Sequence, residues 1–140
     1  MFEFVINKNT KKKECEEKIL ELEKKFNIVF PEILKEYYSR YDGEMIHYCN
    51  INTEEDPEIV SEIVSIQDGE FESLKEELDS DGFIPETMFP IAGTRGGDYY
   101  FWDKKSGEVC LIYGDDIDNP TKRANSVSEF FEMLERSQNK

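Results

Sequence analysis

The sequence predicts an α+β fold, in which a twisted, mainly antiparallel sheet packs against N-terminal helices, one middle helix and a C-terminal helix. Two observations predict it: apolar residues recur at helical spacing near both ends of the chain, and short strand-like segments joined by tight turns fill the second half. A length of 140 residues is typical of one compact domain. We therefore expect a single domain over residues 1–140.

Two helices are expected before residue 44. The first follows Thr10 as its N-cap, and its buried face has the spacing i, i+4, i+7: Cys15, Ile19, Leu22 and Phe26. The second has Pro31 in its first turn, where a missing N–H costs nothing, and ends at Asp42 and Gly43. Its apolar stripe comprises Ile33, Leu34, Tyr37, Tyr38 and Tyr41.

The middle of the chain predicts two strands and a helix. Residues 44–51 contain a short apolar stretch that suits a strand, and the polar run 52–58 suits a loop. The β-branched segment from Ile59 to Ile66 predicts the next strand. Asp68 or Gly69 then caps a helix that ends before Phe83 and has as its apolar residues Phe71, Leu74 and Leu78.

The last third predicts an antiparallel meander followed by a helix. Its three strands span residues 88–92, 99–102 and 109–113, and Gly107 takes a positive φ in the turn between the last two. The final helix begins at Ser126 with a capping box completed by Glu129. Its buried face is expected to comprise Val127, Phe130, Phe131 and Leu134.

The net charge of −15 is concentrated in one part of the chain. Residues 41–90 carry one Lys or Arg against fifteen Asp or Glu, or −14, whereas residues 1–40 carry +1 and residues 91–140 carry −2. Such a field repels nucleic acid and anionic membranes and attracts cationic partners. General solubility is the alternative explanation, but it does not require this concentration.

The residue types needed for common enzyme mechanisms are scarce. His47 is the only histidine, and Cys49 lies two residues from it with no third group indicated. Asp98 and Asp103 flank an aromatic run and are the best candidates for a catalytic carboxylic acid, but a strand-boundary or turn role explains them better. The three cysteines are odd in number and widely spaced, which predicts reduced, structural thiols. We expect no catalytic residue and no cofactor.

Two further segments resemble known ligand-binding loops. Asp115, Asp116 and Asp118 resemble part of a calcium loop, but the required glycine and distant glutamate are out of register. The glycine loop 93–97 lacks the lysine and the helix of a phosphate-binding loop. We therefore expect no metal site, an acidic surface loop at 115–118 and a simple strand connection at 93–97.

Two motifs resemble those of the SUKH superfamily, whose founding eukaryotic members regulate cell-wall synthesis in yeast. The first motif is a proline-started helix ending at an Asp-Gly turn, matched by Pro31, Glu32, Leu34, Tyr37, Tyr38, Asp42 and Gly43. The second is a Pro-aliphatic-Ala strand, a glycine loop and an aromatic strand, matched by Phe89–Ala92 and Gly97–Asp103. The resemblance implies an α+β fold without catalytic activity. Many bacterial members are immunity proteins, which bind and block a toxin, often a nuclease.

Charge and resemblance together predict a cytoplasmic immunity protein that binds a cognate, basic toxin, with no nucleic acid or membrane as partner. The alternative is a regulatory module that binds a cellular partner and no toxin. The chain lacks the apolar run of a secretory signal, which favours the cytoplasm. Charge placement alone predicts the contact residues, which are Tyr48, Glu54, Glu55, Asp56, Glu58, Asp115, Asp116 and Asp118.

Overall fold

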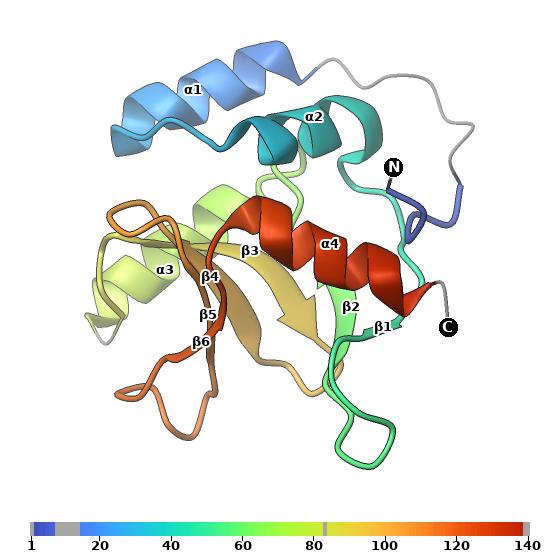
Figure 1. The fold of residues 1–140 in the computed structure, drawn as a ribbon. Coiled ribbons are helices and arrows are strands. Elements are labelled where there is room, and N and C mark those ends of the chain that lie inside the picture. The colour runs from blue at the N-terminus through green and yellow to red at the C-terminus, as the bar shows by residue number, and fades with distance from the viewer. Residues whose placement is uncertain (1, 8–14, 83, 139–140) are drawn as a thin grey trace.

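A computed structural model describes residues 2–7, 15–82 and 84–138 (Figure 1). Four helices and a six-stranded sheet make up the fold. The N-terminal helices come first, α3 interrupts the strands, and α4 ends the chain. In chain order the elements are α1 (Glu16–Phe26), α2 (Glu32–Tyr41), β1 (Cys49–Asn50), β2 (Ile59–Ile63), α3 (Glu70–Asp81), β3 (Met88–Thr94), β4 (Tyr99–Asp103), β5 (Val109–Ile112), β6 (Thr121–Ala124) and α4 (Val127–Ser137).

The sheet is an antiparallel meander in which strand order follows chain order, β1-β2-β3-β4-β5-β6. Every neighbouring pair is antiparallel. The loops after β1, β3 and β5 therefore all lie at one end of the sheet, as Figure 1 shows. This confirms the predicted α+β class and mainly antiparallel sheet.

The two faces of the sheet are covered differently. Residues of α1, α2 and α4 pack with Phe89, Trp102 and Leu111 in the main core, whereas Phe101 and Ile112 point to the opposite face. Leu78 of α3 covers that second face, and Phe71 at the start of α3 reaches the main core. Figure 1 shows α4 lying across one face and α3 behind the sheet.

The N-terminal helices match the predicted pattern with small shifts at their starts. Helix α1 begins at Glu16; Thr10, the predicted N-cap, lies outside the described residues. Pro31 occupies the N-cap position of α2 itself, and its carbonyl accepts hydrogen bonds from the amides of Leu34 and Lys35. Gly43 has the left-handed φ of 82° that the turn after α2 requires.

The second strand is shorter than predicted because the backbone amides of residues 65–67 donate hydrogen bonds to side-chain carboxylates and not to a neighbouring strand. Strand β2 ends at Ile63, not at Ile66. The buried Asp42 accepts hydrogen bonds from the amides of Ile66 and Gln67 and from the Ser65 hydroxyl, at 2.9 to 3.0 Å. These bonds turn the chain away from the sheet and tie the end of α2 to the approach to α3.

Two features of the fold were missed by the sequence analysis. Strand β6 pairs with β5, although its polar sequence, Thr-Lys-Arg-Ala, gives no strand signal. Helix α3 buries Phe71 as predicted, but its second buried residue is Lys75, and Leu74 and Leu78 are only half-buried. Lys75 is 2% exposed, and its Nζ donates to the carbonyls of Glu86 and Met88, at 2.8 Å each.

The predicted helix cap at Ser126, the predicted turn at Gly107 and the cysteines are as expected. Ser126 Oγ accepts a hydrogen bond from the Glu129 amide at 3.0 Å, and Glu129 reaches back to Asn125. Gly107 has a φ of 82° in the turn before β5. All three cysteines are free and buried. Within the described ranges, no helix has the length and apolar character needed to cross a bilayer.

Candidate partner-binding surface

Both predicted acidic patches lie at the same end of the sheet. The first occupies the loop between β1 and β2, the second the loop between β5 and β6, and the glycine loop 95–98 lies between them (Figure 1). The Arg95 amide donates to the Ile59 carbonyl at 3.1 Å, and the Gly114 amide donates to Asp98 Oδ1 at 2.7 Å. The segment 95–98 is thus bonded to the first residue of β2, next to the first acidic loop, and to the second acidic loop itself.

The loop between β1 and β2 exposes Glu54, Glu55 and Asp56. Its backbone is fixed by side chains: Asn52 Nδ2 donates to the Asp56 carbonyl at 2.8 Å, and the Asp56 amide donates to Thr53 Oγ1 at 3.0 Å. Such bonds let polar loop residues replace a backbone ladder. They hold three carboxylates on the outside of an ordered turn.

Glu58 differs from these three carboxylates because it is bound within the protein. Its side chain is 11% exposed, and its Oε1 accepts hydrogen bonds from Tyr100 Oη at 2.6 Å and from Arg123 Nε at 2.9 Å. Arg123 Nη2 lies 2.9 Å from Glu58 Oε2. The Glu58 hydrogen bonds raise the pKa of Arg123. The Glu58 carboxylate therefore connects Arg123 of β6 with Tyr100 of β4 and is poorly placed to contact a partner.

The loop between β5 and β6 exposes Asp115, Asp116 and Asp118. Asp116 Oδ1 accepts a hydrogen bond from Asn119 Nδ2 at 2.7 Å, and the Asp116 amide donates to the Tyr113 carbonyl at 3.0 Å. Within residues 2–7, 15–82 and 84–138, no three His, Cys, Asp or Glu side chains form a group that could hold a metal ion. This loop presents three surface carboxylates.

A cleft of about 280 Å³ opens between the three loops. Asp56, Asp98, Tyr113 and the Glu58–Arg123 pair line it together with Arg95. Its charges are mixed, so the cleft does not select strongly for one sign. The carboxylates of Glu54, Glu55 and the 115–118 loop lie outside it.

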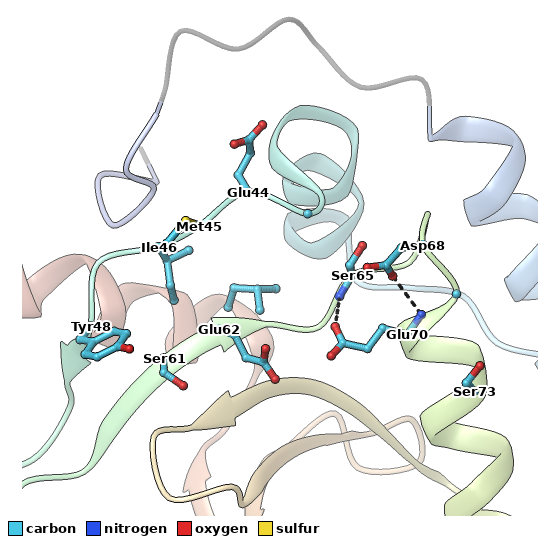
Figure 2. Close-up of a pocket in the computed structure, with 13 residues that line it drawn as sticks. Glu44, Met45, Ile46, Tyr48, Ser61, Glu62, Ser65, Asp68, Glu70 and Ser73 are labelled. Carbon is cyan, nitrogen blue, oxygen red and sulfur yellow. Dashed lines mark hydrogen bonds between the residues drawn. The ribbon is translucent and has the colours of Figure 1, made fainter.

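The remaining predicted contact residue, Tyr48, lies beside a larger groove that the sequence analysis missed. Tyr48 is 62% exposed, and the Arg95 guanidinium carbon lies 5.6 Å from the centre of its ring. The groove has a volume of about 580 Å³ and lies between segment 43–48, strand β2 and the start of α3 (Figure 2). Tyr48 and Arg95 connect this groove with the loop end of the sheet.

Among the residues that the structure describes, the lining of the groove includes carboxylates and no Lys, Arg or His side chain. Four acidic residues line it: Glu44, Glu62, Asp68 and Glu70. They lie on three separate segments, so no local motif joins them in sequence. The excess of negative charge in residues 41–90 was the only sequence signal that contained them.

The surroundings of Glu62 disfavour the charged form of its carboxyl group. Burial raises the pKa of its carboxyl group, and Glu70 and Asp68 raise it further. The Glu62 side chain lies across Gly93 so closely that a Cβ at this position would come within 2.8 Å of Glu62 Oε1. A glycine in β3 thus makes room for a carboxylate that the rest of the groove disfavours.

Replacing Glu62 with glutamine is expected to stabilise the protein at pH 7 by roughly 0.5 kcal/mol, a small effect because solvent screens a half-buried charge. The carboxyl group of Glu62 has a higher pKa in the folded protein than in the unfolded chain. Its ionisation therefore destabilises the fold above the folded pKa and has no effect on stability below the ordinary value of about 4.5. The gain should therefore develop as the pH rises from 4 to 7. Urea unfolding of both proteins at the two pH values measures it; an equal gain at both values would contradict the prediction.

The side chains considered for catalysis have structural roles. Cys49 is buried, burial raises the pKa of its thiol, and its Sγ lies 3.2 Å from the His47 carbonyl. Asp98 Oδ1 accepts from the Gly114 amide, and Asp103 Oδ1 accepts from the Lys105 amide at 2.9 Å. These contacts organise turns and strand ends.

The fold and its surfaces define a class: an acidic α+β domain that displays carboxylates on loops at one end of a meander and along a neighbouring groove. Residues 15–133 match the model of the SMI1 / KNR4 family (SUKH-1), and the chain belongs to that family. A comparison with curated proteins found no match.

Proposed function

We propose that this SUKH protein is a non-catalytic immunity protein that binds and neutralises a cognate, basic toxin in the cytoplasm. One observation carries the proposal. Residues 41–90 have a charge of −14, and their only Lys or Arg is Lys75, which is buried under its own hydrogen bonds. The outer surface of this segment is therefore anionic, with no cation of its own to offset the field.

Such a surface suits a partner that itself binds anions. A nuclease, for example, holds phosphates in a basic groove, and carboxylates of an inhibitor can occupy that groove instead. Charges of this kind raise the association rate by about 10 to 1,000-fold at low salt. Family membership is compatible with an immunity role.

The proposed contact surface is the loop end of the sheet. Glu54, Glu55 and Asp56 form one part of it, and Asp115, Asp116 and Asp118 the other, with Tyr48 as an aromatic anchor at its margin. Glu58 belongs to this surface by position, but Arg123 and Tyr100 hold its carboxylate. Its contribution is to keep the loop in place.

The test is protection by co-expression. Cells that express the toxin encoded beside this gene should survive when they also express this protein, and a pull-down should recover the complex. If the protein binds a cellular partner and gives no protection, the regulatory alternative replaces this proposal.

Replacing Glu54, Glu55 and Asp56 together with serine should slow association with that toxin by about ten-fold at low salt and change the dissociation rate little. The difference should shrink as salt is added, because screening removes long-range attraction. Surface plasmon resonance at two ionic strengths measures both rates. The matched control replaces three exposed or half-exposed acids on the helices, Glu17, Glu36 and Glu132, which changes the net charge equally. Equal slowing by both triple variants would show that only net charge matters.

A further inference from the structure

An exposed apolar patch lies next to the acidic groove. Within the described parts of the chain, six large hydrophobic side chains are exposed, and three of them belong to two paired segments: Ile6 at 49%, Met45 at 75% and Tyr48 at 62%. The Ile6 amide donates to the Met45 carbonyl at 3.1 Å, and Val5 pairs with Ile46 in an antiparallel bridge. Apolar side chains gathered in this way are typical of a surface that another molecule covers.

Met45 and Tyr48 also line the groove, so the patch forms its rim. Figure 2 shows the segment carrying Glu44, Met45, Ile46 and Tyr48 on one side, Ser61 and Glu62 of β2 in the middle, and Asp68 and Glu70 on the far side. The hollow of about 580 Å³ is therefore apolar at one edge and acidic across its floor and opposite wall.

Backbone amides hold two of the groove carboxylates in place. Asp68 Oδ1 accepts a hydrogen bond from the Glu70 amide at 3.0 Å, and Glu70 Oε1 accepts one from the Ser65 amide at 3.1 Å, as dashed lines in Figure 2 show. Each carboxylate keeps a second oxygen outside these bonds. Glu62, between them and the rim, has no hydrogen bond or ion pair with any of the described residues. The groove thus offers several preorganised acceptors, and no Lys, Arg or His is among the described residues that line it.

Tyr48 shows that a guanidinium fits this rim. Arg95 already places its guanidinium carbon 5.6 Å from the centre of the Tyr48 ring, in the range of a cation–π contact. A planar guanidinium can at the same time donate in parallel to carboxylate oxygens, which an ammonium group cannot do in fixed geometry. Arg95 already occupies this ring, so an incoming arginine is expected deeper in the groove, where the carboxylates of the acidic floor favour its guanidinium over an ammonium group.

We infer that the groove between segment 43–48, β2 and α3 is a docking site for a basic segment of a protein partner, which inserts an arginine among Glu62, Asp68 and Glu70 and covers Met45 and Tyr48 with a neighbouring apolar side chain. The inference rests on the proposed function in that it gives the protein partner a second point of attachment. Charge complementarity selects the occupant, because an acidic or uncharged segment would leave the groove carboxylates desolvated and unpaired.

The first experiment uses a peptide, so it does not depend on any toxin. The ¹⁵N-labelled protein is titrated with acetyl-Leu-Arg-Gly-Arg-Leu-amide and, separately, with the same peptide carrying glutamate in place of arginine. The arginine peptide should shift the amide signals of residues 44–48 and 61–70, and the glutamate peptide should shift none of them. Shifts confined to the loops 51–58 and 113–120, or equal binding of both peptides, would overturn the inference.

The second experiment removes two groove charges without removing hydrogen-bond acceptors. Glu62→Gln with Glu70→Gln should weaken binding of the arginine peptide about ten-fold, and the amide oxygen of glutamine can still accept from the Ser65 amide. Glu17→Gln with Glu132→Gln changes the net charge equally on α1 and α4, outside the groove, and should leave the affinity unchanged. Equal weakening in both double variants would overturn the site.

The same variants separate this inference from the proposed function. If the Glu62/Glu70 variant binds the co-expressed toxin and protects cells as well as the unchanged protein does, the groove is not the docking site and the immunity role stands. If the arginine peptide binds in the groove but the unchanged protein gives no protection, the groove stands and the immunity role fails.

Discussion

Replacing Lys75 with methionine is expected to lower the free energy of unfolding by about 3 kcal/mol, because the change removes the ammonium donor from one buried and one part-buried carbonyl. Lys75 Nζ donates to the carbonyls of Glu86 and Met88, lies 2.9 Å from Asp79 Oδ1, and sits 4.2 Å from the centre of the Phe89 ring. These contacts tie α3 to the start of β3. Methionine fills a similar volume and supplies none of them.

Lys122→Met is the matched control, since it removes the same charge from a lysine in β6 whose partner, Glu108, is itself on the surface. Surface pairs of this kind contribute about 1 kcal/mol or less. Urea unfolding curves give both losses, and an unchanged slope shows that the unfolding reaction is the same. Comparable losses in the two variants would mean that the bonds of Lys75 merely replace those that water would make.

Lys75 also shows where sequence patterns fail for this fold. Helical spacing correctly predicted the apolar faces of α1, α2 and α4, because each of those helices packs one apolar stripe against the main core. Of the residues predicted for these faces, Phe26 and Ile33 are only partly buried. Helix α3 is divided between two clusters: Phe71 packs in the main core, whereas Leu78 packs against the small cluster around Phe101 and Ile112. A lysine stem can be buried there once its ammonium group meets two carbonyls, and no periodicity predicts those carbonyls.

Strand β6 escaped prediction for a related reason. Its residues are polar and partly exposed, so neither alternation nor β-branched content indicates a strand. The strand forms because its backbone pairs with the edge of β5 and because Arg123 forms an ion pair with Glu58. Tertiary pairing therefore decides the structure of this segment, and local propensity does not.

The sequence predicted how much negative charge the surface carries, but only part of where the carboxylates lie. The sequence analysis located the excess charge in residues 41–90 and chose the loop carrying Glu54, Glu55 and Asp56, which is exposed at one end of the sheet. It could not join Glu62 to Asp68 and Glu70, because the turn held by Asp42 brings the start of α3 back beside β2. The groove therefore depends on how this turn directs the chain, and the number of charges in the sequence does not indicate that direction.

Removing the partner of Glu58 is expected to be costly and to show that this residue has a structural role. Arg123→Met should lower the free energy of unfolding by about 2 to 3 kcal/mol, because it leaves a carboxylate that is 11% exposed with Tyr100 as the one side-chain donor that remains to it among the described residues. Burial and the Glu58 hydrogen bond raise the pKa of Tyr100 well above its usual range, so the phenol stays a donor at every working pH. Tyr100→Phe should cost less, about 1 kcal/mol.

A double-mutant cycle isolates the interaction between the two charges. If Glu58 and Arg123 act as a pair, Arg123→Met combined with Glu58→Gln should cost at least 1 kcal/mol less than the sum of the single changes, because the second change removes the stranded charge. Additive losses would mean that the two side chains stabilise the sheet separately. Association with a basic partner gives the complementary readout: Glu58→Gln should slow it less than serine at the exposed Glu54 does, because a carboxylate already bound to Arg123 contributes little field outside the protein. A buried pair and an exposed acid only four residues apart would then have separable effects, one on folding and the other on the rate of encounter.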